Sequence, residues 1–334
     1  MRRLPPLDRA GRRARTALCR ALAAAFSVAF AVAPLVALAE SPVATAPGGA
    51  GAPRARIVSL NPSLSEIVLA LGARDVLVGV DTYTHRQHPE LDDVPDVGGL
   101  FDPSLEAVVA LRPDAVVLVP SAEQRDFRGR LEALGVRVVV FANLRFDEVL
   151  ANITRLGDLV GEPAQARARV ARIRATRAAV RGVTASRAPV RCLVALQREP
   201  VFVVGAGNFI DEMLASAGCE NVGRALGEGY PRASLEWVVA QAPDVVFDTS
   251  EHAAGAGSEA ERAEIARFWQ RWSAIPAVRT ERVLQVDART LTLPGPALDV
   301  ALRQLALALH GAEVDAAIAA TLDGDLAPSV EPGR

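Results

Sequence analysis

The chain has 334 residues, half of them hydrophobic, which is enough for two domains of ordinary size with a large core. Its formal net charge is -2 at pH 7. A nucleic-acid-binding protein would need a basic cluster or stripe, so this charge balance gives no argument for a nucleic-acid partner or for an anionic membrane surface.

The first forty residues have the composition of an export signal. Several arginines precede an uncharged apolar run at 21–39, which ends with small residues at Ala37 and Ala39. We expect a signal peptide at 1–39, cleaved after Ala39. An uncleaved membrane anchor is the alternative, because about 20 apolar residues can span a bilayer. Residues 40–55, rich in Ala, Pro and Gly, are expected to form a flexible tether.

Residues 56–145 alternate short apolar strands with helices. The strands are expected at 56–60, 76–80, 115–119 and 136–141. Ser63, with Glu66 three residues later, is expected to cap the first helix. Strands that alternate with helices at this spacing predict a parallel sheet covered on both faces.

Residues 146–188 are expected to be helical, with one interruption before Pro163, which suits the first turn of a new helix. Arginine recurs at nearly every second or third position of 164–181, which leaves only a thin apolar stripe. The stripe consists of Val170, Ile173 and Val180. Such a helix would pack on one narrow side and would serve as a stiff connector about 30 Å long between two lobes.

Residues 189–312 are expected to form a second α/β lobe, and 313–334 a tail. The two predicted lobes contain a repeated sequence segment. Ser104–Val117 recurs as Ser234–Phe247, with Ser, Leu, Glu, Pro and Asp at matching positions and no gap. Each copy is typical of a short amphipathic helix, a Pro-Asp turn and a buried strand. Two lobes of similar design imply a cleft between them.

Glu106 and Glu236 occupy the same position in the two copies of the repeat. Each follows a serine that can cap its helix, and the helix dipole favours a carboxylate in the first turn, so a structural role would explain both. The alternative is a docking pair, one glutamate per lobe, for basic residues on a partner. Their presence in both copies favours that alternative.

Two cysteines, Cys192 and Cys219, follow the expected signal peptide. They fall in the same predicted lobe and could pair in an oxidising compartment. Two buried free thiols are the alternative, and the residue pattern does not choose between them.

No residue pattern in the chain indicates catalysis. His85 and His88 have a spacing that could bind a metal, but the first strand supplies no histidine, so we interpret them as surface residues and expect no metal site. Gly205 and Gly207 lack the remainder of a dinucleotide fingerprint and are expected to form a tight turn. There is also no nucleophile elbow or zinc-protease motif. We therefore expect that the protein is not an enzyme and has no cofactor.

Several motifs, taken in order over roughly 56–310, resemble a periplasmic binding protein of the helical-backbone type. This family delivers cobalamin, ferric siderophores or haem to an importer of the ATP-binding cassette class. The motifs are the strand-loop-helix at 57–72, the turns at 79–83 and 95–99, the Ser-Leu-Glu helices with their Pro-Asp strands, and the mid-chain helix. The resemblance implies a monomeric periplasmic protein with two Rossmann-like lobes, parallel sheets, a single long backbone helix and a ligand cleft between the lobes.

The resemblance also implies roles for individual residues. Glu106 and Glu236 match the surface glutamates that dock onto arginines of the inner-membrane permease. Ligand contacts are implied for Tyr83, Phe101, Phe202, Tyr230 and Asp287. Broad apolar walls with a few polar anchors suit a flat corrin or porphyrin, although core packing is an alternative role for each aromatic residue.

Among family members, the chain is most similar to the cobalamin-binding branch, and cobalamin is the expected ligand. A ferric siderophore or haem is the alternative ligand, with Tyr83 or His85 as an axial ligand in the case of haem. An exported α/β enzyme that acts on a tetrapyrrole or chelate is the alternative from another class, because a fold does not determine a function. The helical connector predicts a small closure on ligand binding.

Overall fold

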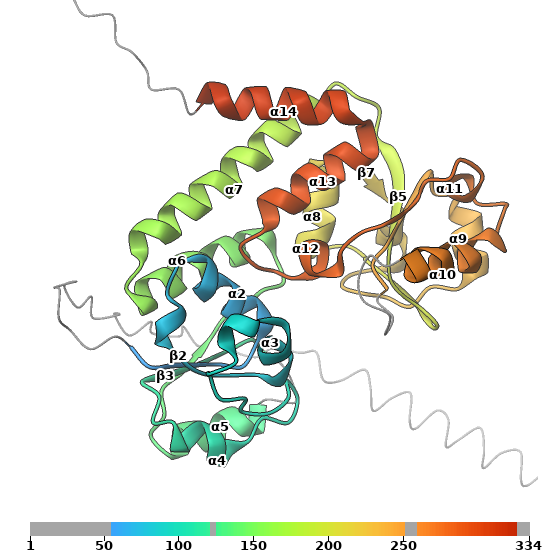
Figure 1. Ribbon diagram of the computed structural model, residues 1–334. Coiled ribbons are helices and arrows are strands. Elements are labelled where there is room, and N and C mark those ends of the chain that lie inside the picture. The colour runs from blue at the N-terminus through green and yellow to red at the C-terminus, as the bar shows by residue number, and fades with distance from the viewer. Residues whose placement is uncertain (1–54, 121–124, 251–258, 326–334) are drawn as a thin grey trace, which may run out of the picture. The chain divides into compact units, whose positions relative to one another are not determined.

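Two separate β-sheets organise the chain, as predicted (Figure 1). The computed structural model describes residues 55–120, 125–250 and 259–325. The expected signal peptide, nearly all of the expected tether and the last nine residues lie outside the described residues. In the part of the chain that is described, no helix combines the length and hydrophobicity needed to cross a membrane.

The first sheet is wholly parallel, with strand order β2-β1-β3-β4. Its strands are β1 (Ile57–Ser59), β2 (Leu77–Val80), β3 (Ala115–Leu118) and β4 (Val138–Val140). Its helices are α2 (Pro62–Ala70), α3 (Thr82–Gln87), α4 (Leu105–Ala110) and α5 (Arg125–Ala133), with short 3-10 turns η1 (Arg74–Val76) and η2 (Pro89–Leu91). We call this sheet and its helices the N-terminal lobe.

Helices cover both faces of this sheet, which explains why its central strands are continuously apolar. Along β1, Ile57 packs in the same cluster as Leu64 of α2, whereas Val58 packs with Val108 of α4 and with Leu131 of α5. Successive strand residues therefore point into two different cores.

The first helix begins earlier than predicted. Asn61, not Ser63, is the N-cap: its side-chain oxygen accepts hydrogen bonds from the Ser63 backbone N–H (3.0 Å) and hydroxyl (2.6 Å). Pro62 then occupies the first turn, where its missing N–H costs nothing. The expected capping box with Glu66 was therefore wrong, and Glu66 is available for a different contact.

The second sheet is mixed, with strand order β6-β5-β8-β9 and β7 also paired to β5. Its strands are β5 (Val190–Arg198), β6 (Val201–Val203), β7 (Cys219–Asn221), β8 (Val245–Asp248) and β9 (Val283–Gln285). Its helices are α8 (Phe209–Ser216), α9 (Leu235–Gln241), α10 (Glu259–Gln270), α11 (Pro276–Arg279), α12 (Ala288–Thr292) and α13 (Leu298–His310), with the 3-10 turn η3 (Val222–Leu226). We call this sheet and its helices the C-terminal lobe.

One strand of this sheet departs from the predicted parallel arrangement. β6 is antiparallel to β5, because only Glu199 and Pro200 separate the two strands. A parallel pair would need a crossover connection of a dozen or more residues. β7, which was not predicted, is parallel to β5 and has only three residues.

The two copies of the repeated segment have the same local structure. The Ser104 hydroxyl accepts the Ala107 N–H (3.2 Å), and the Ser234 hydroxyl accepts the Trp237 N–H (3.1 Å). The matching residues Arg112 and Ala242 both adopt left-handed backbone conformations, at φ 45° and 49°. In each copy the next residue is a proline, which disfavours continuation of the helix.

An arginine at the start of each lobe donates a hydrogen bond to the carboxyl end of the repeat helix. Arg56 donates to the Leu111 carbonyl and Arg191 donates to the matching Gln241 carbonyl, each at 2.7 Å. A cation is favourable at the carboxyl end of a helix and satisfies carbonyls that have no partner within the helix. The two lobes thus share side-chain contacts as well as their order of elements.

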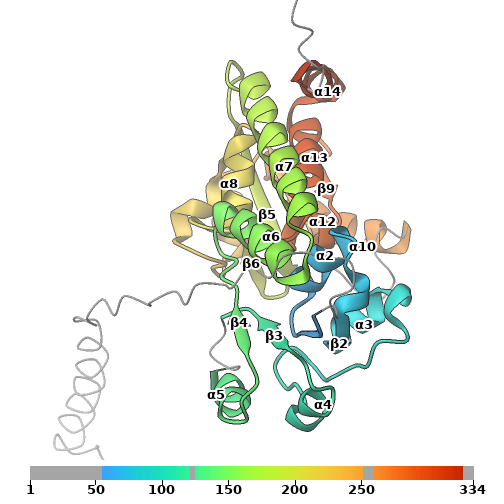
Figure 2. The same cartoon turned by 90° about the vertical axis from the view of Figure 1, so that its left-hand side faces the viewer.

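Two long helices, α6 (Phe146–Val160) and α7 (Pro163–Thr184), follow the N-terminal lobe. Figure 2 shows α7 alongside α6 and α13. The prediction that α7 packs on one narrow side was wrong, because it also contacts α8, α13 and α14 (Ala312–Asp325). Alanine and threonine widen the buried face beyond the predicted stripe. The buried residues are Ala166, Val170, Ile173, Thr176, Ala179, Val180 and Thr184.

The expected tail at 313–334 contains the helix α14. Val314 and Ile318, one turn apart, are fully buried against the helical layer, and Arg303 forms a bidentate ion pair with Asp315 at 3.0 Å for both bonds. The tail prediction was therefore wrong for this segment. Its apolar residues recur with a helical period, although they lie among alanines that give little contrast.

The structure joins Cys192 and Cys219 by a disulfide, with their Cα atoms 5.9 Å apart. The pairing of β5 with β7 brings the two residues together, since Val190 lies opposite Cys219 and Cys192 lies opposite Asn221. Of the two alternatives for these cysteines, the structure has the disulfide.

Candidate functional site

A cavity of about 420 Å³ lies at the carboxyl ends of three strands of the C-terminal lobe. It is lined by Leu196 near the end of β5, Thr249 after β8, Ala288 and Thr292 of α12 after β9, Ile210 of α8, and Tyr230. The carboxyl ends of strands are the usual ligand position in α/β folds of this kind. The lining combines apolar surface with hydroxyl groups, which suits a largely apolar ligand that has a few polar anchors.

Tyr230 is the predicted ligand residue that lines this cavity. Its side chain keeps 42% exposure, and desolvation by the surrounding protein raises its pKa to about 12. Its phenol therefore stays protonated at physiological pH and can donate a hydrogen bond. The loop that carries it is held by Asn208, whose side-chain amide donates to the Gly229 carbonyl at 3.1 Å.

The predicted tight turn at Gly205 and Gly207 supports the same loop. Gly205 N–H donates to the Gly229 carbonyl (2.9 Å), and a Cβ at position 205 would collide with backbone oxygen of the Tyr230 loop. Only glycine allows this close approach. The turn thus supports the loop that carries Tyr230.

Asp287 borders the cavity without lining it. It is the N-cap of α12, where its carboxylate accepts the Arg289 N–H (3.1 Å) and the Thr290 hydroxyl (2.7 Å). The next residue, Ala288, contributes to the cavity wall. Asp287 therefore orients the helix that forms this wall.

Phe202 lies in β6, half-buried, and its backbone pairs with Arg232. It is not among the residues that line the 420 Å³ cavity. Its strand pairs with the residues that directly follow Tyr230, since Val203 N–H also donates to the Pro231 carbonyl at 3.0 Å.

Tyr83 and Phe101 are exposed aromatic residues of the N-terminal lobe, with 46% and 67% of their surface accessible. Tyr83 lies in the first turn of α3, where its N–H donates to the carboxylate of Asp81 (3.0 Å). Burial raises the pKa of Asp81, and hydrogen bonds from Thr84 and Tyr83 oppose that rise. Both side chains are therefore accessible to a ligand.

A contact between the lobes involves a glutamate whose partner the sequence did not indicate. Arg289 of α12 donates to the Glu66 carboxylate of α2, and Arg289 Nη2 lies 3.3 Å from His88 Nε2. His88 Nε2 also lies 3.1 Å from Glu66, and Nδ1 lies 2.8 Å from Glu90. The hydrogen bond with His88 lowers the pKa of Glu90. His88 is thus a buried member of an ion-pair network, and its interpretation as a surface residue was wrong.

The equivalent glutamate of the C-terminal lobe makes a matching contact. Glu212 of α8 precedes Gly218 by the same six residues that separate Glu66 from Gly72. Its carboxylate lies 2.8 Å from Arg145 Nε, at the start of α6, and 3.4 Å from Arg177 of α7. Each lobe therefore contributes one glutamate to an ion pair that reaches beyond that lobe.

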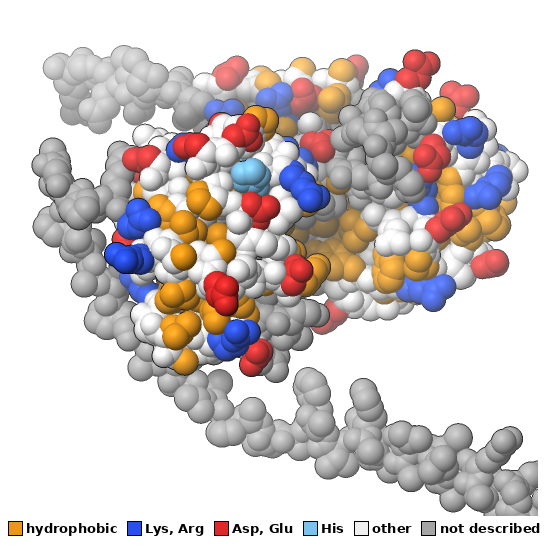
Figure 3. Space-filling view, turned by 60° about the horizontal axis from the view of Figure 1, so that its bottom comes forward, with side chains coloured by type: hydrophobic (Ala, Val, Ile, Leu, Met, Phe, Trp, Pro, Cys, Tyr) orange, Lys and Arg blue, Asp and Glu red, His pale blue; other side chains and the backbone are white. Residues whose placement is uncertain are grey.

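Glu106 and Glu236 are exposed in the first turns of α4 and α9. Within the described residues, neither carboxylate has a hydrogen-bonding or ion-pairing partner. Figure 3 shows acidic, basic and hydrophobic side chains interspersed over the face in view, without a continuous basic area. Across the described ranges, no group of three His, Cys, Asp or Glu side chains could hold a metal ion.

The sequence profile of the periplasmic binding protein family matches residues 57–290, which is most of the chain. The chain belongs to this family. The predicted family and the predicted α/β class are confirmed, with sheets that are parallel except for the β5–β6 pair.

This periplasmic binding protein is similar to proteins of two ligand groups. The vitamin B12-binding protein of Vibrio cholerae is 27% identical over 245 residues, which cover 73% of this chain and 85% of the relative. The crystal structure of the periplasmic vitamin B12 binding protein of Vibrio cholerae has a TM-score of 0.65 at 26% identity, over 77% and 97% of the two chains. The periplasmic haem-binding protein of Pseudomonas aeruginosa has the same TM-score at 30% identity, over 77% and 93%.

Proposed function

We propose that this periplasmic binding protein captures cobalamin and delivers it to the inner-membrane permease of an importer of the ATP-binding cassette class. The observation that carries the proposal is the similarity to vitamin B12-binding proteins over 85% of their length. The relatives are named as binding proteins, which supports a carrier without catalytic activity. On this proposal the chain is exported to the periplasm, loses residues 1–39 and acts as a monomer.

Ligand contact is proposed for both lobes. From the C-terminal lobe, the ligand would contact Tyr230 and the start of α12 at Asp287. From the N-terminal lobe, it would contact Tyr83 and Phe101. Exposed aromatic faces suit the broad apolar edge of a corrin, and the protonated Tyr230 phenol supplies a hydrogen-bond donor. Phe202 would contribute at the rim of the site.

Permease docking is proposed for Glu106 and Glu236. Both carboxylates are exposed, and both occupy the same place in structurally equivalent helices. A pair of matched acidic groups, one per lobe, suits a partner that presents a basic group to each lobe.

Haem is the second candidate ligand. The similarity to the haem-binding protein of Pseudomonas aeruginosa, at 30% identity, favours it specifically. In that case Tyr83 or the half-buried His85 of α3 would approach the iron from the N-terminal lobe.

Calorimetric titration of the exported protein, beginning at residue 40, tests the proposal. Cyanocobalamin is expected to bind with 1:1 stoichiometry and a Kd below about 1 μM, which corresponds to about 8 kcal/mol. The double substitution of Tyr83→Ala and Tyr230→Ala should raise the Kd at least about fivefold, because each aromatic contact contributes about 0.5–1.5 kcal/mol beyond its area. Leu134→Ala, at an exposed residue directly after α5, serves as the control.

If cyanocobalamin gives no heat and haem binds saturably, haem replaces cobalamin as the proposed ligand. Absence of binding to both would contradict the carrier proposal for these two ligand classes.

A further inference from the structure

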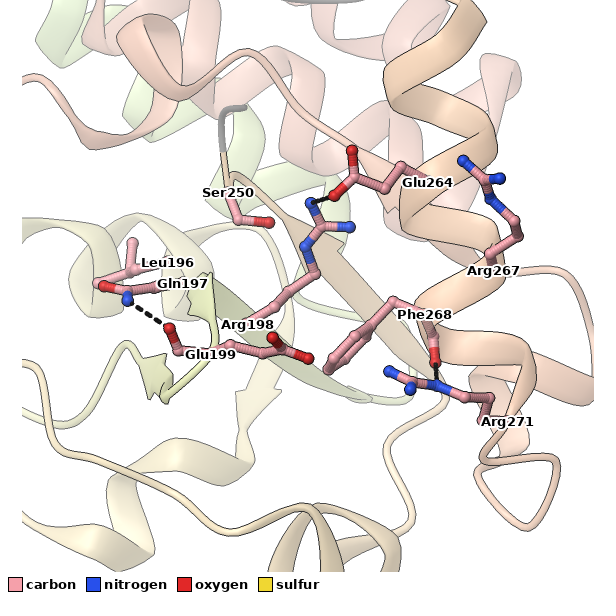
Figure 4. A pocket seen from close by; sticks show the side chains of 9 residues that line it. All are labelled: Leu196, Gln197, Arg198, Glu199, Ser250, Glu264, Arg267, Phe268 and Arg271. Atoms are coloured by element: carbon pink, nitrogen blue, oxygen red, sulfur yellow. Dashed lines mark hydrogen bonds and ion pairs between the residues drawn. The ribbon is translucent and has the colours of Figure 1, made fainter. Parts of the chain in front are cut away.

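A second cavity, of about 590 Å³, lies in the C-terminal lobe (Figure 4). It shares the lining residue Leu196 with the first cavity. It lies between the end of β5, Ser250 after β8, and one side of α10. Unlike the first cavity, its lining is rich in charge, with three arginines and two glutamates. The chemistry available to a ligand therefore changes from apolar to ionic across Leu196.

Phe268 of α10 organises two of these arginines. The guanidinium carbon of Arg198 lies 5.7 Å from the centre of the Phe268 ring, and that of Arg271 lies 4.9 Å from it. Stacking on an aromatic ring suits a guanidinium and reduces the entropy that it loses when it binds a ligand. Phe268 is itself only 8% exposed, so it provides a fixed support.

Arg198 belongs to the wall of the cavity. It is 4% exposed, and its Nη2 lies 3.3 Å from the Glu264 carboxylate of α10. This ion pair offsets one positive and one negative charge of the lining. Among the described lining residues, Arg267, Arg271 and Glu199 remain, so their formal charges leave one positive charge in excess.

Arg267 and Arg271 each use one nitrogen for an internal hydrogen bond. Arg267 Nε donates to Ala263 and Arg271 Nε donates to Phe268, both to backbone carbonyls at 3.2 Å. Among the described residues, these are the hydrogen bonds that the two guanidinium groups make. Their terminal nitrogens retain the fork of donors that binds carboxylate or phosphate in bidentate fashion.

We propose that this second cavity is an anion subsite, in which Arg271 and Arg267 bind a carboxylate or phosphodiester group of the ligand whose apolar body occupies the first cavity. The inference rests on the proposed function. Both cavities share the lining residue Leu196, so a bulky ligand that extends past this residue would occupy both. Cyanocobalamin has a phosphodiester in its nucleotide loop, and haem has two carboxylates. The subsite thus discriminates among chelates by their anionic group.

Matched ligands with and without the anionic group test the inference. Arg271→Gln and Arg267→Gln are expected to weaken cyanocobalamin binding about tenfold each and to leave binding of dicyanocobinamide, which lacks the phosphodiester, within about twofold. Glu199→Gln should change cyanocobalamin affinity in the opposite direction, because it removes a repelling charge. Arg279→Gln is the control, since Arg279 is an exposed arginine of the same lobe that donates to a backbone carbonyl outside the cavity.

Haem and its dimethyl ester provide the second pair of ligands. A loss confined to cyanocobalamin identifies a phosphodiester as the group bound, and a loss confined to unesterified haem identifies a carboxylate. Equal weakening of both members of each pair, or unchanged binding in both arginine variants, would overturn the subsite. If the wild-type protein binds no chelate, the proposed function fails, and binding of inorganic phosphate then tests the subsite alone. Millimolar phosphate binding that Arg271→Gln abolishes would support the subsite. Absence of phosphate binding would reject the subsite.

Discussion

Simultaneous replacement of Glu106 and Glu236 by arginine is expected to reduce ligand uptake at least about thirtyfold and to leave ligand affinity unchanged. Removal of one partner from a close charge pair at an interface costs about 2–5 kcal/mol, and 2 kcal/mol already corresponds to a factor of about thirty. The cost to the fold is smaller, because an unfavourable charge in the first turn of a helix costs about 0.3–1 kcal/mol.

Two measurements check this prediction. Uptake of labelled cyanocobalamin is measured in the source organism with the double variant in place of the wild-type gene, and ligand affinity is measured by calorimetry on the purified protein. The control variant carries Glu132→Arg and Glu313→Arg, at exposed glutamates of α5 and α14 outside the repeat. Wild-type uptake by the double variant would show that the permease binds elsewhere.

The double substitution of Cys192→Ala and Cys219→Ala, which removes the disulfide, is expected to lower the free energy of unfolding by about 3 kcal/mol. The bond joins residues 27 positions apart, and closure of a loop of this length restricts the unfolded chain by about that amount. Denaturant titration of the oxidised protein, the reduced wild type and the variant measures the effect. Identical denaturation midpoints for oxidised and reduced wild type would show that the bond adds no stability.

The reduced wild type also separates two contributions to this loss. Cys192 is fully buried in the core, so alanine at this position removes packing in addition to the covalent bond. The variant should therefore be slightly less stable than the reduced protein. Because Leu196 and Arg198 lie further along the same strand, β5, the disulfide also anchors the strand that contributes lining residues to both cavities.

The elements of the repeat could be predicted because local pattern determines them. Ser104 and Ser234 cap their helices, and the prolines at 113 and 243 prevent their continuation, all within a few residues. The arginines that close these helices could not be predicted, since Arg56 reaches a carbonyl 55 residues away. A long flexible side chain gives no local sign of its partner.

The departures from prediction have similar causes. The antiparallel β6 follows from a two-residue connection that could have been recognised as a hairpin. The buried face of α7 includes small residues such as Ala166, which fit close helix packing but give a weak hydrophobic pattern. The helix α14 combines both difficulties, because its few large apolar residues lie among alanines.

The candidate site was less accessible to prediction than the fold. Tyr230 was proposed through the family resemblance and lies at a cavity, whereas Thr249 and Thr292 of the same cavity carry no distinctive pattern. The contact between Arg289 and Glu66 joins residues 223 positions apart. Such pairs become visible only when the sheet order and the helix packing are known.

The expected small closure on ligand binding remains a prediction, and the core supports it. One continuous hydrophobic cluster includes Ile57 of the first sheet, Ile153 of α6, Ile173 of α7 and Val194 of the second sheet. Wide opening would expose part of this cluster to water at a cost of about 25 cal/mol for each Å² of apolar surface. The ion pairs of Glu66 and Glu212 add contacts that a wide motion would break.

The crystal structure of the exported protein with cyanocobalamin bound tests the central claim most directly. We predict a single corrin held between the two lobes, in contact with Tyr83 on one side and with Tyr230 on the other. A corrin bound to one lobe alone, away from both tyrosines, would contradict this account of the ligand site.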